Sequence, residues 1–111
     1  MLKKKFRLLK ETKFDKKNSY TSPFFALKTA KNEESFSRFG FIVSKKIDKR
    51  ATVRNRLKRQ IRVFIETNLE DIETGYDIMF ILKKELLGKT TEEIKEITQD
   101  ALKKQRLIKS R

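Results

Sequence analysis

Eighteen residues near the middle of the chain constrain it most, because they combine dense positive charge with a helical apolar stripe. Residues 45–62 read KKIDKRATVRNRLKRQIR, in which nine side chains are Lys or Arg and one, Asp48, is acidic. Apolar residues recur there at three- and four-residue steps, which predicts one buried helix face; they are Val53, Leu57, Ile61 and Phe64. At about 100° per residue, the polar side chains occupy the rest of the circumference: Asn55, Arg56, Lys58, Arg59 and Arg62, with Arg54 at the border. The segment therefore predicts a helix fixed to a core on one side and presenting cations on the other.

A phosphate backbone is the partner that this density of cations fits best, because each Lys or Arg placed against a phosphate releases condensed counterions. Two other interpretations stay open: a face that only keeps the protein soluble, and a nuclear localisation signal. A solubilising surface usually mixes both signs of charge, and a localisation signal is usually a flexible basic run without an apolar stripe. Both therefore fit this segment less well.

The net charge of +14 is confined to two regions of the chain. Residues 1–17 carry +6 and residues 45–62 carry +8, so the remaining residues sum to zero. Such localisation is typical of a nucleic-acid-binding protein. A membrane surface is the competing anionic partner, but the apolar stripe is narrow and the chain has no Trp for an interface.

Length and composition predict one domain over residues 1–111, with a modest core and frayed ends at 1–6 and 109–111. The longest apolar runs are too short to span a bilayer, and no apolar stretch follows the basic N-terminus as in a signal peptide. We therefore expect a cytoplasmic protein.

The residue types that are absent exclude much catalytic chemistry. The chain has neither His nor Cys, which removes the commonest general base, the commonest metal ligand and the thiolate nucleophile. Its acidic residues cluster outside the basic segment, and no Gly-rich phosphate loop is present. We expect no catalytic residue and no metal held by the protein alone.

Periodicity and turn residues predict a mixed α/β domain. The clearest expected strand is residues 36–44; a buried strand is also expected at residues 76–82, and a final helix opened by a capping box of Thr90 and Glu93. Thr52 is the expected N-cap of the basic helix, which should end near Leu69 or Ile72. The remaining expected elements are a helix over 8–17, a turn at 18–23, a hairpin of strands 24–30 and 36–44, and a right-handed crossover that places 76–82 parallel to 36–44.

The two hairpin strands suggest a shallow groove for single-stranded nucleic acid, because bases stack on aromatic rings while cations track the phosphates. Its expected lining is Phe24, Ala26 and Lys28 from one strand and Arg38, Gly40, Ile42 and Ser44 from the next, flanked by Phe14. The alternative is that Phe14 and Phe24 are ordinary core residues. Gly40 likewise marks either a close approach of another group or room for a neighbouring core side chain.

The stretch RFGFIVSKKIDKRATVRNRLKRQIR resembles the signature of the bacterial ribonuclease P protein subunit. The resemblance rests on a strand ending in Ser44-Lys45-Lys46, then Arg54-Asn55-Arg56, and then Leu57, Lys58, Arg59 and Arg62. It extends over nearly the whole chain. It implies an α/β (α+β) two-layer sandwich of ribosomal-protein-like type, with the order αβββαβα, a mixed four-stranded sheet, an extra short strand around 19–22 and a rare left-handed βαβ crossover.

The resemblance also implies a function. Members bind a catalytic RNA that removes the 5′ leader of precursor tRNA with Mg²⁺, which is held mainly by the RNA, and they require no protein partner. The residues implied to bind the RNA subunit are Lys46, Lys49, Arg50, Arg54, Asn55, Arg56, Lys58, Arg59 and Arg62. Those implied to line the leader cleft are Phe14, Phe24, Lys28, Ser44 and Lys45.

This sequence departs from the family pattern at three places. Lys28 and Asn18 stand where aromatic residues are common, which shifts weight from base stacking to phosphate contacts, and Asp48-Lys49-Arg50 replaces a Gly-bearing turn. Two other classes remain: a ribosomal or other structural RNA-binding protein, and an autonomous nuclease. The nuclease would need buried carboxylates within the basic region.

Overall fold

The strand β4 (Tyr76–Leu82) lies at the centre of the sheet and organises the fold. Its near-continuous apolar run, YDIMFIL, pairs antiparallel with β2 (Phe25–Lys31) and parallel with β3 (Arg38–Ile42). The short strand β1 (Ser19–Thr21) pairs with the far side of β2, which gives the order β1-β2-β4-β3. A strand this apolar is stabilised by a paired neighbour on each side and by a covered core face.

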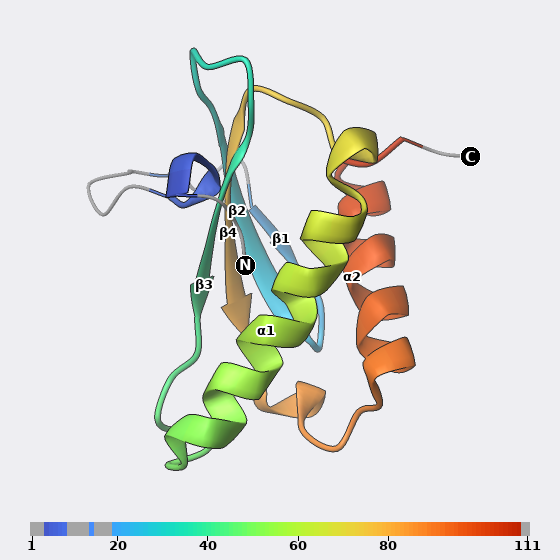
Figure 1. Cartoon of the computed structure of the whole chain (residues 1–111). Coiled ribbons are helices and arrows are strands. Elements are labelled where there is room, and N and C mark those ends of the chain that lie inside the picture. Colours follow the sequence, from blue (N-terminus) through green and yellow to red (C-terminus); the bar gives the residue numbers. More distant parts are fainter. Residues whose placement is uncertain (1–3, 9–13, 15–18, 110–111) are drawn as a thin grey trace.

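The computed structural model describes residues 4–8, 14 and 19–109. Two helices, α1 (Ala51–Thr67) and α2 (Thr91–Lys104), cover one face of the sheet, so the described part forms two layers (Figure 1). Short 3-10 turns occur at Lys4–Phe6, Leu69–Asp71 and Lys84–Leu86. The two-layer α+β class is confirmed, and the expected first helix falls on residues outside the described ranges apart from Leu8 and Phe14.

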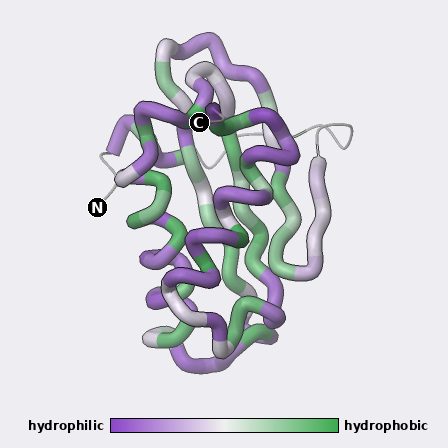
Figure 2. The backbone as a smooth tube through the Cα atoms, turned by 90° about the vertical axis from the view of Figure 1, so that its right-hand side faces the viewer, coloured by the Kyte–Doolittle hydropathy of each residue, from purple (hydrophilic) through white to green (hydrophobic). Residues whose placement is uncertain are grey.

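The core lies between the sheet and the helices. Phe80 of β4 is fully buried and contacts Phe25 edge to face, with 5.7 Å between ring centroids, and Phe41 in a stacked pair at 5.5 Å. Figure 2 shows hydrophilic and hydrophobic residues alternating along the helices, as expected for elements with one buried face. The helices contribute Leu57, Ile61, Phe64, Ile65, Ile94, Ala101 and Leu102 to this core.

The strand order corrects the expected hairpin. β2 and β3 are not neighbours, because β4 lies between them. The parallel pairing of β3 with β4 is confirmed. In Figure 1, α1 lies in front of the sheet and both strands run downward with β4 to the right of β3, so the crossover is left-handed. The generic right-handed expectation is wrong: β4 on the other side of β3 would be an edge strand with its apolar run uncovered.

Element ends match the sequence to different degrees. The strand at 76–82 and the Thr90–Glu93 capping box are confirmed, with Glu93 N–H donating to Thr90 Oγ1 at 3.1 Å. The expected N-cap Thr52 lies inside α1, whose N-cap is Arg50 and whose last residue is Thr67. The expected turn at 18–23 contains β1, as the resemblance implied. The expected frayed start is partly ordered, since Lys4–Phe6 form a 3-10 turn in which Phe6 packs edge-on against Phe36.

A buried ion pair fixes the start of β4 to β3. Asp77 is 4% exposed and accepts two hydrogen bonds from the Arg38 guanidinium, at 2.8 and 2.9 Å. Asn32 Nδ2 donates a third at 2.9 Å. These bonds to Asp77 raise the pKa of Arg38 above its ordinary value. A buried pair of this kind destabilises the fold strongly when one partner is removed, because the other is left uncompensated.

We therefore expect Asp77→Ala to lower the free energy of unfolding by about 3 kcal/mol, because Arg38 and Asn32 lose their acceptor. Urea unfolding followed by circular dichroism measures this loss. The matched control is Glu96→Ala, which removes an exposed carboxylate of α2 and should change stability by less than about 0.5 kcal/mol. Equal stability of the two variants would contradict a structural role for the pair.

Candidate nucleic-acid interface

Helix α1 presents its cations to solvent because its apolar side packs against the core. Leu57 is 2% and Ile61 0% exposed, which fixes the rotation of the helix about its axis. The exposed polar side chains of residues 44–62 are Ser44, Lys45, Lys46, Lys49, Arg50, Thr52, Asn55, Arg56 and Arg59, while the cations Arg54, Lys58 and Arg62 are half-buried. The structure thus brings the predicted RNA-subunit-binding residues onto one side of the molecule.

The start of α1 is electrostatically unusual. Its N-cap, Arg50, makes no side-chain capping bond, and its first turn holds no acidic residue. Cations therefore gather at the end of the helix that already carries the positive pole of the macrodipole, which is unfavourable for the isolated fold by a few tenths of a kcal/mol per exposed charge. Within the described part of the chain, Arg56 and Arg59 have no carboxylate within ion-pair distance. This end of the helix is suited to an anion.

Two arginines of the basic segment are engaged by the loop that precedes the helix. The Arg50 guanidinium donates two hydrogen bonds to Asp48, from Nε to Oδ1 at 3.0 Å and from Nη2 to Oδ2 at 2.9 Å. Arg54 Nη1 donates to the backbone carbonyls of Asp48 and Lys49, both at 2.9 Å. Both arginines were expected to contact RNA, and periodicity could not reveal these bonds.

The groove beside the edge of β3 includes a cation that was not among the predicted site residues. Arg7 forms a parallel bridge with Phe39 on the edge of the sheet, and the next N–H, of Leu8, donates to the Phe39 carbonyl at 2.9 Å. Arg7, Lys58 and Arg62 line a groove of about 360 Å³ together with Leu8, Phe39, Gly40 and Phe41. The available signal was the +6 charge of residues 1–17.

The sheet face opposite the helices carries part of the predicted leader cleft. Lys28, Met79 and Gly40 form one row across β2, β4 and β3, and the next row toward α1 is Ala26, Ile81 and Ile42. Lys28 is exposed, and Ile42 is 47% exposed. We call these six residues, which lie on the side away from the helices, the open sheet face; Leu8 covers part of it beside Gly40 and Met79. Ser44 and Lys45 follow the end of β3 and are exposed, so the open sheet face leads directly to the start of α1.

Gly40 has a packing reason. A Cβ at this position would lie 2.8 Å from Leu8 Cδ2, 3.1 Å from Leu8 Cβ and 3.2 Å from Met79 Sδ. Glycine therefore makes room for neighbouring side chains, and it allows residues 7 and 8 to lie against β3. The close approach of another group, which is one of the two explanations left open by the sequence, is therefore met by Leu8.

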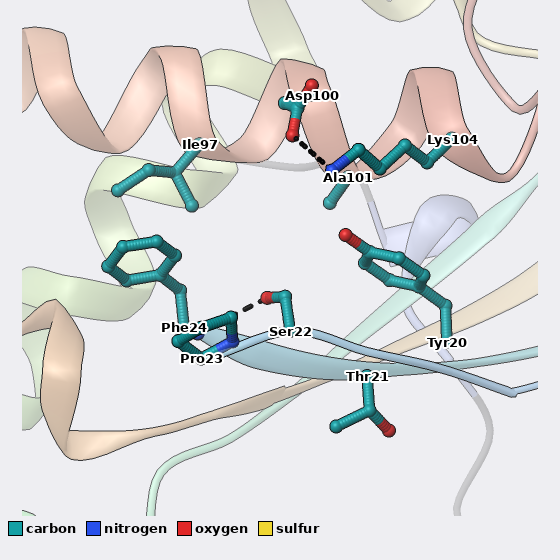
Figure 3. Close-up of a pocket in the computed structure, with 9 residues that line it drawn as sticks. All are labelled: Tyr20, Thr21, Ser22, Pro23, Phe24, Ile97, Asp100, Ala101 and Lys104. Carbon is teal, nitrogen blue, oxygen red and sulfur yellow. Dashed lines mark hydrogen bonds and ion pairs between the residues drawn. The ribbon is translucent and has the colours of Figure 1, made fainter.

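Phe24 does not belong to the open sheet face, which corrects the groove expected from the sequence. The Ser22 hydroxyl accepts from the N–H groups of Phe24 and Phe25, both at 3.2 Å, and forms a turn in which Phe24 leaves the strand alternation. Its ring packs against the core near Ile97 of α2 (Figure 3). Lys89 Nζ lies 5.5 Å from the ring centroid. Phe24 thus lines a pocket of about 370 Å³ between β1 and α2. Phe14 is half-buried.

The described side chains do not form a metal site. Within residues 4–8, 14 and 19–109, no group of three acidic side chains gathers closely enough to hold an ion. In the basic segment, both oxygens of Asp48 are occupied by Arg50.

Neither helix in the described part of the chain is long and apolar enough to cross a bilayer.

The fold and this surface define a class: small, basic α+β proteins with a mixed sheet, a left-handed crossover and one cationic helix. A family model for ribonuclease P matches residues 2–106, and the chain belongs to that family.

Known proteins agree with this assignment. The ribonuclease P protein component of Fusobacterium nucleatum is 41% identical over 78 residues, covering 70% of this chain and 68% of that protein. The one from Alkaliphilus oremlandii is 32% identical over 97 residues, covering 87% and 84%. The solved structure of the Staphylococcus aureus RNase P protein superposes with a TM-score of 0.76 at 29% identity, covering 82% of this chain and 83% of that one. Family membership supports a role as a ribonuclease P subunit in tRNA processing.

The bonds from Arg50 lower the pKa of Asp48 to about 2. A carboxylate whose pKa is lower in the folded protein stabilises the fold at pH values above its unfolded-state pKa of about 3.9. This contribution is lost as the pH falls through the folded-state pKa. We expect the difference in Tm between the wild type and Asp48→Asn to be constant near neutral pH and to shrink between about pH 4 and about pH 2. Thermal unfolding across this range measures it. A difference that stays constant down to the lowest pH would contradict the ion pair.

Proposed function

We propose that this protein binds the catalytic RNA of ribonuclease P through the N-terminal half of α1 and its preceding loop, and binds the 5′ leader of precursor tRNA on the open sheet face. The observation that carries the proposal is the one-sided cationic start of α1, where Arg56 and Arg59 are exposed and the first turn has no acidic residue. A fold gains nothing from this arrangement, whereas a phosphate backbone does.

The contact with the RNA subunit is assigned to side chains that the protein itself leaves available. Exposed cations can approach phosphates without first breaking an internal bond, so they should contribute most to counterion release. Asn55 adds an exposed amide that both donates and accepts hydrogen bonds. The available cations are Lys45, Lys46, Lys49, Arg56 and Arg59, with Lys58, Arg62 and Arg7 beside the edge of β3.

The leader is assigned to the open sheet face because that face continues into the same cations. A single strand crossing from Lys28 over Ile81 and Ile42 would reach Ser44 and Lys45, next to the start of α1. The two rows hold aliphatic and thioether side chains and no ring, so contact with bases there is mainly apolar, and Lys28 supplies a phosphate contact. Phe14 is the aromatic residue proposed to flank this path.

The chemistry is assigned to the RNA. The residues of the RNA face do not fit Mg²⁺, since the only carboxylate of the basic segment is held by Arg50, and the chain has no His or Cys to act as a base or nucleophile. What these residues can do is bind and orient, which lowers the entropic part of the barrier. The proposal is therefore a cytoplasmic, non-catalytic subunit that needs no protein partner and acts with Mg²⁺ held mainly by the RNA.

The direct test is cleavage of precursor tRNA at low magnesium by a bacterial ribonuclease P RNA alone, by this protein alone, and by the mixture. We expect leader removal to be strongly enhanced in the mixture and absent with the protein alone. No enhancement with several such RNAs would refute the proposal and favour a structural RNA-binding role. Cleavage by the protein alone would reveal an active site in the chain.

The binding face itself is tested by the salt dependence of RNA affinity. We expect Arg56→Gln and Arg59→Gln each to weaken binding and to reduce the log–log salt slope by up to about one unit, because each removes one phosphate contact. The matched control is Lys103→Gln, which removes an exposed cation from α2 and should leave the slope unchanged. If the salt slopes of Arg56→Gln and Arg59→Gln equal that of Lys103→Gln, the RNA binds another part of the surface.

A further inference from the structure

Two residues, Asp48 and Arg54, hold the loop between β3 and α1 through hydrogen bonds within the protein. Asp48 opposes the charge of an RNA, and Arg54 was expected to contact one. We infer that both are positioning residues for RNA binding: together they hold residues 48–50 in a fixed shape, and Arg54 acts through this loop instead of through a phosphate. The inference rests on the proposed function, because it concerns the face assigned to the RNA subunit.

Asp48 closes a small ring with the N-cap residue of α1. Its Oδ1 accepts from the backbone N–H of Arg50 at 2.8 Å and from Arg50 Nε at 3.0 Å, while Oδ2 accepts from Nη2 at 2.9 Å. The Asp48 side chain is 15% exposed, whereas that of Arg50 is 72% exposed. A bidentate arginine pair fixes orientation as well as distance. One carboxylate therefore sets both the backbone entering the helix and the direction of the Arg50 side chain.

Arg54 holds the same loop from the helix. Its Nη1 reaches back to the carbonyls of Asp48 and Lys49, each at 2.9 Å, so one nitrogen bridges two consecutive peptide groups. The side chain is half-buried, unlike those of Arg56 and Arg59. A phosphate could bind this nitrogen only if its two hydrogen bonds to the backbone carbonyl oxygens were broken. The geometry thus separates Arg54 from the exposed arginines of the same helix.

The first half of the connection is also hydrogen-bonded. The N–H of Ile47 donates to the Ser44 carbonyl at 3.0 Å, and the N–H of Lys46 donates to Ser44 Oγ at 3.0 Å. Residues 44–50 are therefore bonded internally at both ends, while Lys45, Lys46 and Lys49 remain exposed. A loop already ordered before binding loses less conformational freedom on binding. This is how an acidic residue can strengthen the binding of a polyanion.

A positioning role of Asp48 and simple electrostatics predict opposite changes in RNA affinity when the carboxylate is removed. Removing a negative charge from a cationic RNA face should tighten binding if only net charge matters. If Asp48 positions the loop, Asp48→Ala should instead weaken binding, by roughly three- to tenfold, since the freed side chains must be ordered at each binding event. The salt slope should not change, because no phosphate contact is lost.

The experiment is a titration of fluorescently labelled ribonuclease P RNA at several salt concentrations with the wild type and three variants. These are Asp48→Ala, Arg54→Gln and, as matched control, Glu96→Ala, which removes an exposed carboxylate from α2. We expect Asp48→Ala and Arg54→Gln to bind more weakly with the wild-type slope, and Glu96→Ala to bind like the wild type. Binding of Asp48→Ala as tight as that of the control, or a slope lowered by about one unit in Arg54→Gln, would overturn the inference.

A second measurement separates this inference from the proposed function. Hydrogen exchange of the Arg50 amide in the free protein should accelerate in Asp48→Ala and stay unchanged in Glu96→Ala, because the amide loses its acceptor. Unchanged exchange would overturn the positioning role even if the wild type binds RNA. If the wild type fails to bind any ribonuclease P RNA while exchange responds as expected, the proposed function fails and the loop has only a structural role.

Discussion

The surface of this protein depends on one constraint, which is the rotation of α1 about its own axis. Leu57 and Ile61 are almost completely buried, and each such side chain contributes about 1.5–3 kcal/mol on burial. Turning the helix by one residue, or about 100°, would expose them. The outward direction of Arg56 and Arg59 therefore follows from the packing of Leu57 and Ile61 in the core.

Fold and function make opposing demands at the start of this helix. Cations there repel one another and the helix dipole, and a chain of charge +14 gains stability when an anion binds. The protein meets the conflict locally: Asp48 holds Arg50, and backbone carbonyls hold Arg54. The remaining cations stay available to a partner. At the other end of the open sheet face, the buried pair of Arg38 and Asp77 keeps β3 and β4 in register.

Local patterns in the sequence predicted local structure well, and non-local pairing poorly. The apolar run at 76–82 and the Thr90–Glu93 capping box are encoded by neighbouring residues, and both are confirmed. The place of β4 between β2 and β3 is set by which strand most needs two neighbours, which no short window reveals. Phe24 was misplaced because the Ser22 turn interrupts the strand alternation. The family resemblance supplied the left-handed crossover, which general rules of chirality oppose.

Lysine acetylation of the protein, free and bound to ribonuclease P RNA, tests the position of the RNA most directly when each site is quantified by mass spectrometry. We expect RNA to protect Lys45, Lys46, Lys49 and Lys58, which belong to the cationic face, and to leave Lys95 and Lys103 of α2 as reactive as in the free protein. Precursor tRNA added to the complex should further protect Lys28. Protection of the α2 lysines with an unprotected start of α1 would contradict this assignment, since the RNA would then lie along α2 instead of at the start of α1.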